Sequence, residues 1–443
     1  MFYTSVCRNK NSLYHKYIDD DGVRHHGSEK YCPVLYKKIG DHLSIQEDTP
    51  HRSLKGAKLK RFQFDDLISY YKEVRKYEET QYGVYGVISP IYQFIAERYP
   101  EESINFDVDK LRILYVDIEV EYTTHFPDPE TAKNPITTIA IHDSLTKETV
   151  VLGTKPSTAK DYVEFEDEKE MLIGFLDIWE GNLYPDIVVT WNGEKFDIPY
   201  IYGRLSKYKL ATRLSPIHSI KKIKKIDEYY KEYTKIDIQG VQLLDLMMFY
   251  KKFITAPRKS YSLDAIGEHD VGINKVDYSD YRNLGNLYEQ NYDLYVEYNR
   301  HDVNLMIAIN NKIKLIELVV TLAYLAKINY TDTISPVKTW DAMAYNYLLR
   351  EGIIVEPKIL REKESYPGAF VMEPIPGLYK WVMSIDVVSM YPKIIQMLNI
   401  GPETLRVKFD PATCSKSPSE IIMEIEKIKT KVGERQNISK KMY

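Results

Sequence analysis

The sequence feature that most constrains the fold is residues 111–120, Leu-Arg-Ile-Leu-Tyr-Val-Asp-Ile-Glu-Val. β-Branched, aromatic and long aliphatic residues dominate this run, which predicts a buried β-strand. Asp117 and Glu119 are two positions apart, so both side chains project from the same face of the strand. Two anions held together in this way repel each other unless a cation lies between them, and carboxylate oxygens suit Mg²⁺ or Mn²⁺. A lone Asp-x-Glu fits a solvated strand end equally well, so a metal site requires further acids.

Two later segments contain acids in comparable positions. Asp197 follows a predicted buried strand over 186–192 and begins a predicted helix, whose N-terminus favours an acidic side chain. Asp302 lies on a helix predicted from 287 to about 310, one turn after Tyr298. Each acid alone has an ordinary structural explanation. Together, four carboxylates from separate elements can hold two divalent ions about 4 Å apart, an arrangement that suits phosphodiester cleavage. A phenol one turn from Asp302 can orient the attacking water.

The chain of 443 residues is long enough for two to four domains. Residues 111–314 alternate between strand and helix patterns, which is typical of an α/β layer. Residues 1–110 are expected to be mixed α+β, with a hairpin turn at 19–22 and a helix over 64–77. Residues 315–357 are mostly helical and are expected to continue the N-terminal domain. A turn-rich linker follows, and residues 381–386 are predicted to form a strand of a third domain that spans 358–443.

Net charge and cysteine content narrow the function classes. A net charge of −4 argues against a general polyanion binder, so any nucleic-acid contact must come from local basic clusters. The clearest cluster spans 207–225 and is followed by a second strand-like run, which suggests a long hairpin; a solvated loop is the alternative. Three widely spaced cysteines support neither a zinc knuckle nor a disulfide framework. Without a secretory signal or membrane-spanning segment, we expect a protein of the reducing cytoplasm.

Three segments carry a specific resemblance: Val116-Asp-Ile-Glu119, Trp191-Asn-Gly-Glu-Lys-Phe-Asp197 and Tyr298-x-x-x-Asp302. They resemble the exonuclease motifs of proofreading family B DNA polymerases, and the chain as a whole is most similar to those of large tailed bacteriophages. The resemblance implies an RNase H-like 3′-5′ exonuclease domain that binds two Mg²⁺ or Mn²⁺ ions. It makes Tyr298 the residue that orients the water, and places a hairpin near 220–238 where primer and template part. The implied metal ligands are Asp117, Glu119, Asp197 and Asp302.

Residues 384–395, Ser-Ile-Asp-Val-Val-Ser-Met-Tyr-Pro-Lys-Ile-Ile, resemble the first motif of the polymerase palm. The resemblance makes Asp386 a metal ligand and a catalytic residue for nucleotidyl transfer. Nucleotide binding would involve the Val387 carbonyl near the metal, the Ser389 and Met390 amides at the triphosphate, and Tyr391 under the sugar. The family also needs a fingers motif and a second palm motif, Asp-Thr-Asp, and this sequence contains neither. We therefore expect 3′-end cleavage from this chain, and extension only with a C-terminal polymerase polypeptide.

The sequence thus predicts the N-terminal part of a replicative DNA polymerase that acts on a DNA primer-template. Deoxynucleoside triphosphates and replisome proteins would be partners of the completed enzyme, in the host-cell cytoplasm if a phage encodes it. Two alternatives stay open, namely a stand-alone 3′-5′ nuclease on DNA or RNA and a non-catalytic nucleic-acid-binding subunit. Cleavage in the presence of Mg²⁺ distinguishes the enzymes from the binding subunit. The residues expected to bind DNA phosphates are Lys221, Lys222, Lys224 and Lys225.

Overall fold

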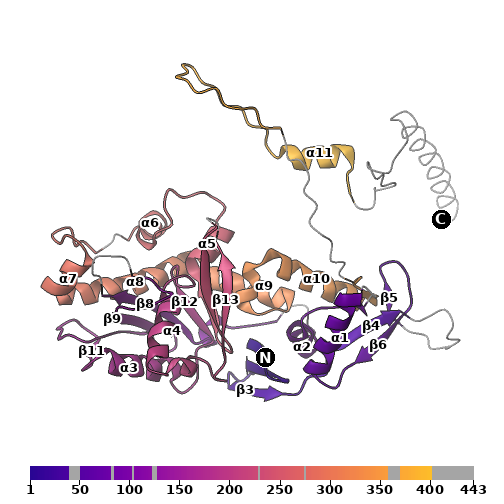
Figure 1. Cartoon of the computed structure of the whole chain (residues 1–443), viewed down its shortest axis with the longest axis horizontal. Coiled ribbons are helices and arrows are strands. Elements are labelled where there is room, and N and C mark those ends of the chain that lie inside the picture. Colours follow the sequence, from indigo (N-terminus) through magenta and orange to yellow (C-terminus); the bar gives the residue numbers. More distant parts are fainter. Residues whose placement is uncertain are drawn as a thin grey trace. The chain divides into compact units, whose positions relative to one another are not determined.

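The computed structural model describes residues 1–401 except 39–49, 81–83, 102–103, 122–126, 228–229, 274–275 and 358–369. The chain forms two compact units, residues 1–362 and 363–443. Both α-helices and β-sheets build the first unit (Figure 1), as the α/β and α+β patterns predicted. No helix among the described residues combines the length and the apolar character needed to cross a bilayer.

An antiparallel meander begins the chain, formed by β1 (Phe2–Asn9), β2 (Ser12–Ile18) and β3 (Arg24–Glu29). The predicted hairpin turn at 19–22 is confirmed, because Ile18 pairs with Arg24 across it. Gly22 has φ +84°, a conformation that glycine adopts without a Cβ clash. A second small sheet contains β6 (Leu59–Gln63), β4 (Val34–Lys38) and β7 (Val84–Tyr85) in that order. Helices α1 (Leu67–Thr80) and α2 (Pro90–Arg98) accompany it, and α1 covers most of the predicted helix over 64–77.

Residues 315–357 return to this N-terminal region. They form α9 (Leu315–Ala326), a 3₁₀ turn (Tyr330–Ile334), α10 (Pro336–Arg350) and β16 (Ile353–Ile354), and β16 pairs with β5 (Arg52–Ser53). The Tyr3 hydroxyl donates to the Ala323 carbonyl over 3.1 Å. The Asn329 amide bonds both backbone groups of Val6, at 3.0 and 2.8 Å. These contacts join residues 315–357 to the N-terminal strands, and a domain shared by the two segments stays a prediction.

Strands between residues 113 and 245 form a six-stranded sheet, in the order β11-β10-β9-β8-β12-β15. Strand β9 is antiparallel to its neighbours β8 and β10, whereas β12 and β15 are parallel to β8. The predicted strand around Asp117 is confirmed as β8. The strands are β8 (Ile113–Val120), β9 (Ile136–Asp143), β10 (Glu148–Gly153), β11 (Tyr162–Glu164), β12 (Ile187–Thr190) and β15 (Gln242–Asp245).

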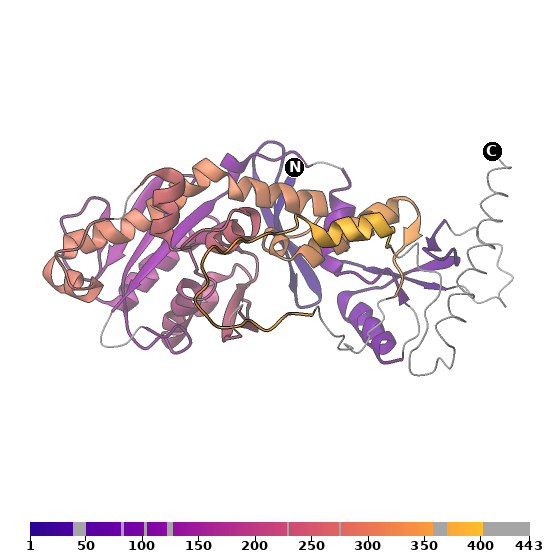
Figure 2. The same ribbon diagram turned by 90° about the horizontal axis from the view of Figure 1, so that it is seen from above.

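Helices cover both faces of this sheet, with α8 (Tyr292–Ile313) on one face and α3 (Glu168–Glu180) and α4 (Asp197–Lys207) on the other (Figure 1). Figure 2 shows α8 lying over the strands when the molecule is seen from above. The alternation along β8 divides its apolar side chains between two cores. Ile113 and Tyr115 join the core that includes α8, whereas Leu114 and Val116 join the core that includes α3 and α4. This division directs the side chain of every second residue, Asp117 and Glu119 included, toward α8.

Arg112, immediately before β8, fixes the start of that strand. Its guanidinium donates to four carbonyls at or just beyond the C-terminus of α3, including those of Ile178 and Trp179, and pairs with Asp143 over 2.7 Å. The last carbonyls of a helix have no partner within the helix, so one buried arginine satisfies several at once.

A long antiparallel hairpin lies between β12 and β15 in the sequence. It consists of β13 (Ile220–Ile226) and β14 (Glu232–Ile238), with Ile220 opposite Ile238 and Ile226 opposite Glu232. The predicted long hairpin is therefore confirmed, with the last lysines of the 207–225 cluster on β13, and for these lysines the solvated-loop alternative is wrong. The remaining helical elements are short turns at 108–110, 211–214 and 267–271, together with α5 (Leu246–Phe253), α6 (Leu263–Ile266) and α7 (Leu284–Gln290).

The second unit is described for residues 370–401 and contains α11 (Met390–Leu398). The predicted strand over 381–386 is wrong, because these residues form neither strand nor helix. Their apolar composition favours a strand only where neighbouring strands supply hydrogen-bond partners. Among the described residues none pairs with this segment, and Trp381 and Ile385 are 99% and 79% exposed. The rest of the predicted third domain, residues 358–369 and 402–443, lies outside the described residues.

Candidate active site

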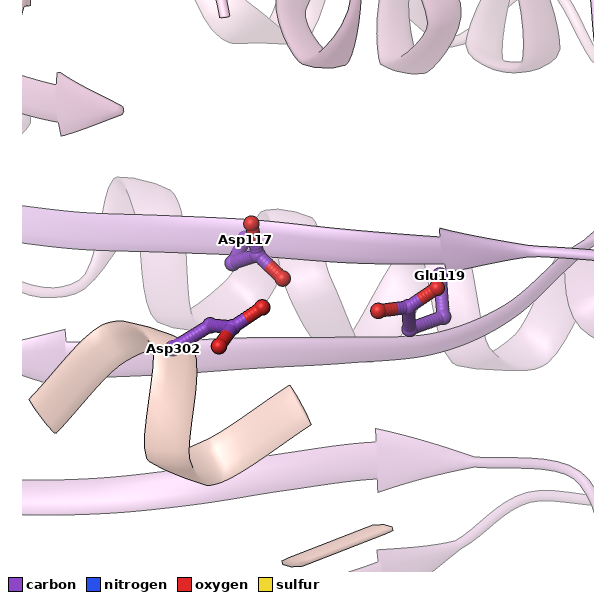
Figure 3. A group of neighbouring side chains, drawn as sticks. All are labelled: Asp117, Glu119 and Asp302. Carbon is purple, nitrogen blue, oxygen red and sulfur yellow. The ribbon is translucent and has the colours of Figure 1, made fainter. Parts of the chain in front are cut away.

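Asp117 and Glu119 on β8 meet Asp302 on α8. One carboxylate oxygen of each residue lies within 4.8 Å of the others, close enough to share a metal ion. Figure 3 shows the three carboxylates turned toward the space between strand and helix. Acids that are far apart in the sequence are thus brought together because α8 packs on the face of β8 that carries them.

The packing of α8 explains why Tyr298 and Asp302 face the sheet. Its N-cap residue Asn291 accepts from the Leu294 amide over 3.1 Å, and its buried stripe includes Val303 and Met306. Burial of that stripe sets the rotation of the helix and therefore the direction of the polar residues one turn away. Tyr298 itself is only 7% exposed.

Asn299 is a site residue that the sequence analysis missed. It is fully buried, and its Nδ2 donates to Oδ2 of Asp117 over 2.7 Å. This hydrogen bond fixes the orientation of the Asp117 carboxylate. The available signal was spacing, because Asn299 lies three residues before Asp302 on the same helix face.

Asp197 lies beside the three clustered acids rather than among them. It is the first residue of α4 and is 5% exposed, and its Oδ1 accepts from the Ile118 amide over 3.3 Å. All four acids line one cleft of about 600 Å³. The structure therefore brings the four predicted acids to one cavity and places three of them within metal-sharing distance. Other residues that line this cleft include Asp128, Trp191, Asn192, Lys195, Phe196 and Lys231.

The loop before Asp197 is held by a second residue that sequence reasoning missed, Asp245. This buried carboxylate accepts from the backbone amides of Asn192 and Glu194, both over 3.1 Å, and caps α5 through the Met248 amide. Asp245 is the last residue of β15, the neighbour of β12. The position of the loop is therefore fixed relative to the sheet. Its position between an apolar strand and a helix was the only signal in the sequence.

Burial and mutual repulsion oppose ionisation of these acids. The pKa of Asp117 is raised well above its usual value, first by burial and then by the charges of Asp197, Asp302 and Glu119. Burial raises the pKa of Asp197 to about 7, although backbone hydrogen bonds offset part of the effect. A bound divalent cation would reverse both effects, because it stabilises the ionised form of every acid around it. Oxygen-only donors around a cleft fit Mg²⁺ or Mn²⁺.

Tyr298 remains a neutral phenol at this site. Burial raises its pKa, and the neighbouring Asp302 and Glu119 carboxylates raise it further. Its ring packs edge-on against Tyr278, with centroids 5.6 Å apart. A protonated hydroxyl at this place can both donate and accept a hydrogen bond, which is what orienting a water molecule requires.

The hairpin lysines differ in their surroundings. Lys221 donates to Gln239 over 3.0 Å, and the Lys222 ammonium lies 4.8 Å from the Tyr202 ring centroid. Lys225 pairs with Glu194 over 3.2 Å. The Lys224 side chain is 72% exposed. Lys221, Lys222 and Lys224 are exposed, whereas Lys225 is partly buried. Phosphate contacts by these four residues stay a prediction.

The predicted palm residues all lie in the second unit and are exposed. Ser389, with φ +55°, precedes α11, and Met390 is its first residue, so both amides are at a helix N-terminus. That position suits a phosphate. Asp386 and Val387 lie in the irregular segment before it, and Tyr391 is 64% exposed. Their roles in nucleotide and metal binding remain predictions.

Comparison with known proteins identifies two regions of the chain. A model of the DNA polymerase family B exonuclease domain matches residues 91–266, and a model of DNA polymerase family B matches 332–441. The DNA-directed DNA polymerase of Escherichia phage RB69 is 32% identical over 93% of this chain and 48% of its own length. That of Enterobacteria phage T4 is 30% identical over 92% and 48%. DNA polymerase 1 of Sulfolobus acidocaldarius is 28% identical over 68% and 36%.

The chain spans about half the length of the two phage polymerases. The match nevertheless runs through both the exonuclease region and the beginning of the polymerase region, in the same order. On this basis the chain belongs to the family B DNA polymerases.

Proposed function

We propose that this chain is the proofreading part of a replicative DNA polymerase and removes nucleotides from the 3′ end of a DNA primer. The observation that carries the proposal is the group of Asp117, Glu119 and Asp302, with one oxygen of each within 4.8 Å, in a cleft that Asp197 also lines. The test is release of deoxynucleoside monophosphates from a 3′-labelled single strand and from a mismatched primer-template. An RNA strand of the same sequence distinguishes a DNA proofreader from a general nuclease.

The strand order supports an RNase H-like fold for this domain. In chain order the strands β8, β9, β10, β12 and β15 are arranged 3-2-1-4-5, with the second strand antiparallel to the rest. The first strand, β8, is central and carries the first two acids. We infer that the domain uses this fold to present its acids on the face of the sheet that α8 covers.

In the proposed mechanism Asp117, Glu119, Asp197 and Asp302 would hold the divalent metal ions. When bound, two such ions supply a hydroxide-like nucleophile and neutralise charge on the departing 3′ oxygen. Tyr298 accepts or donates a hydrogen bond to the attacking water and keeps its oxygen in line with the phosphorus. Asn299 keeps the Asp117 carboxylate in its ligating orientation through the 2.7 Å hydrogen bond. The exposed lysines of the hairpin would attract the phosphate backbone.

The metal requirement is expected to depend on pH. Since the metal-free site holds Asp197 with a pKa of about 7 and Asp117 with a raised pKa, metal binding must displace protons. The Mg²⁺ concentration for half-maximal cleavage should therefore fall as pH rises from 6 to 8, by up to about tenfold per pH unit for each proton released. The Mn²⁺ dissociation constant, measured by electron paramagnetic resonance in the absence of DNA, should fall with rising pH in the same way. A midpoint that stays constant over this range contradicts the predicted protonation.

Loss of the Tyr298 hydroxyl should slow the chemical step. We expect Tyr298→Phe to lower the single-turnover rate by about 10²-fold, the effect of one lost transition-state hydrogen bond. DNA affinity, measured by fluorescence anisotropy in Ca²⁺, should change little because the ring is retained. Tyr278→Phe is the matched control, since it removes the hydroxyl from the neighbouring ring that packs against Tyr298. If Tyr298→Phe cleaves at the same single-turnover rate as Tyr278→Phe and the unaltered protein, Tyr298 takes no part in the reaction.

We further propose that the palm residues of the second unit serve nucleotidyl transfer in a completed enzyme. Asp386 would hold a metal ion, and Val387, Ser389, Met390 and Tyr391 would contact a deoxynucleoside triphosphate. The completing elements would come from C-terminal polymerase sequence, and replisome proteins would be further partners. The match of residues 332–441 to the polymerase family supports this assignment.

A further inference from the structure

Glu194 connects the loop of the exonuclease cleft to both strands of the β13–β14 hairpin. It lies three residues before Asp197, and its side chain is only 12% exposed. The Tyr233 hydroxyl donates to its Oε1 over 2.9 Å, and the Lys225 ammonium does so over 3.2 Å. The Lys235 ammonium bonds the other oxygen, Oε2. One carboxylate thus joins three hairpin side chains.

The loop is also held from the opposite side. Asp245 accepts from the amides of Asn192 and Glu194, so the backbone of the loop is tied to the sheet. The next residue, Lys195, lines the cleft and pairs with Asp227, directly after β13, over 3.1 Å. The loop that ends at Asp197 therefore lies between two anchors, one on the sheet and one on the hairpin.

The hairpin anchor is a mostly buried carboxylate with three hydrogen-bond donors. Burial opposes the ionisation of Glu194, but Lys235 and Lys225 outweigh it and its pKa lies below the usual value. Removing one partner from a buried, hydrogen-bonded ion pair leaves an uncompensated charge, which is strongly destabilising. The hairpin and the loop are therefore expected to move together. Because a displacement of about 1 Å in a catalytic group can cost about 10²-fold in rate, such movement would matter at Asp197.

We propose that Glu194 is a positioning residue that couples the β13–β14 hairpin to the loop carrying Asp197. Through this coupling, contact between DNA and the hairpin sets the geometry of the exonuclease site. The inference rests on the proposed nuclease function and adds to it a route by which the hairpin acts on the metal site. Glu194 makes no contact with substrate in this role.

The test compares Glu194→Gln, Lys235→Met and the double variant on single-stranded and mismatched primer-template DNA. We expect each single variant to lower kcat by about 10- to 100-fold with KM changed less than twofold, and to weaken Mn²⁺ binding. The double variant should be no slower than the slower single variant, because both break the same link. Glu232→Gln, at an exposed position of β14, is the matched control and should stay within twofold of the unaltered protein.

The coupling is overturned if both single variants keep the kcat and the Mn²⁺ affinity of the unaltered protein. It is also overturned if the kcat of the double variant falls by the product of the two single losses. A lower melting temperature with unchanged kcat and Mn²⁺ affinity would also overturn it, since Glu194 would then only stabilise the fold. If Glu194→Gln does not fold, Lys235→Met decides the question by the same readouts. Failure of the nuclease assignment itself is distinct, because the unaltered protein would then not cleave DNA at all.

Discussion

Replacement of Asp117 by asparagine will lower 3′-end cleavage by about 10³-fold or more and will raise the melting temperature of the metal-free protein. The first effect follows because a metal ion supplies several kcal/mol of transition-state stabilisation, at about 1.4 kcal/mol per factor of ten. The carbonyl oxygen of the introduced asparagine would still accept the hydrogen bond that Asn299 donates to Asp117 over 2.7 Å. The substitution therefore removes a charge and leaves the local geometry.

The second effect follows from the raised pKa of Asp117. A carboxyl whose folded pKa lies above its unfolded value binds a proton in the folded state that the unfolded chain has released. Stability then falls as pH rises from the unfolded pKa through the folded pKa. Asparagine carries no such charge, so at pH 7.5 in EDTA we expect a melting temperature higher by about 2–4 °C, as expected for about 1 kcal/mol in a domain of this size. Saturating Mg²⁺ should reverse the order, because it stabilises only the protein with the complete site.

Glu164→Gln is the control, since it removes an exposed acid from β11 of the same sheet. It should change neither cleavage nor the melting temperature in EDTA. Cleavage by Asp117→Asn at the rate of the unaltered protein would refute the nuclease assignment. A lower melting temperature of Asp117→Asn in EDTA would instead refute the electrostatic account of the site while leaving its chemistry open.

The parts of the site that the sequence predicted are those that depend on local periodicity. Alternation along residues 111–120 placed Asp117 and Glu119 on one face, and helical spacing placed Tyr298 beside Asp302. Neither pattern specifies which face of α8 meets which face of β8. That choice comes from burial of residues such as Val303 and Met306 against the sheet. Periodicity alone could not show that Asp302 joins Asp117 and Glu119 in one site. The resemblance to a known family supplied that prediction.

Residues that act through tertiary contacts were not predicted. Asn299, Asp245 and Glu194 have ordinary surroundings in the sequence, and their roles depend on partners that are between 31 and 182 residues away. The lysine cluster shows the converse limit. Its sequence suggested phosphate binding by all of these lysines, whereas Lys225 pairs with the buried Glu194 over 3.2 Å and Lys224 lies 3.9 Å from the more exposed Glu130. Composition identifies charges, but only packing shows which charges are already paired.

The same reasoning explains the incorrect strand over residues 381–386. An apolar run favours a strand when other strands flank it, and β8 meets that condition with β9 and β12 as neighbours. Residues 381–386 have no strand partner among the described residues, and Trp381 is 99% exposed. Strand formation is thus a property of the assembled sheet rather than of the segment.

Tested by itself, the 443-residue polypeptide will add no nucleotide to a primer while shortening the same primer in Mg²⁺. Nucleotidyl transfer needs two ions held by more than one carboxylate, and the sequence has Asp386 but no Asp-Thr-Asp palm motif. The Asp386 segment is also exposed and carries large apolar side chains, Ile385 at 79% and Val388 at 82% exposure, which a polymerase domain would bury. The measurement is a gel assay of a labelled primer-template with all four deoxynucleoside triphosphates.

Adding a polypeptide with the remaining palm, fingers and thumb sequence of a phage relative should restore extension. In that mixture Asp386→Asn should lower the rate of extension by about 10³-fold or more, because it removes a metal ligand. The rate of cleavage should stay within twofold. Asp117→Asn should have the opposite pattern, with extension retained and cleavage lost. Because the two acids belong to separate units, residues 1–362 and 363–443, the two losses should be independent. Extension by the 443-residue chain alone that disappears with Asp386→Asn would contradict the prediction and show that one palm aspartate suffices.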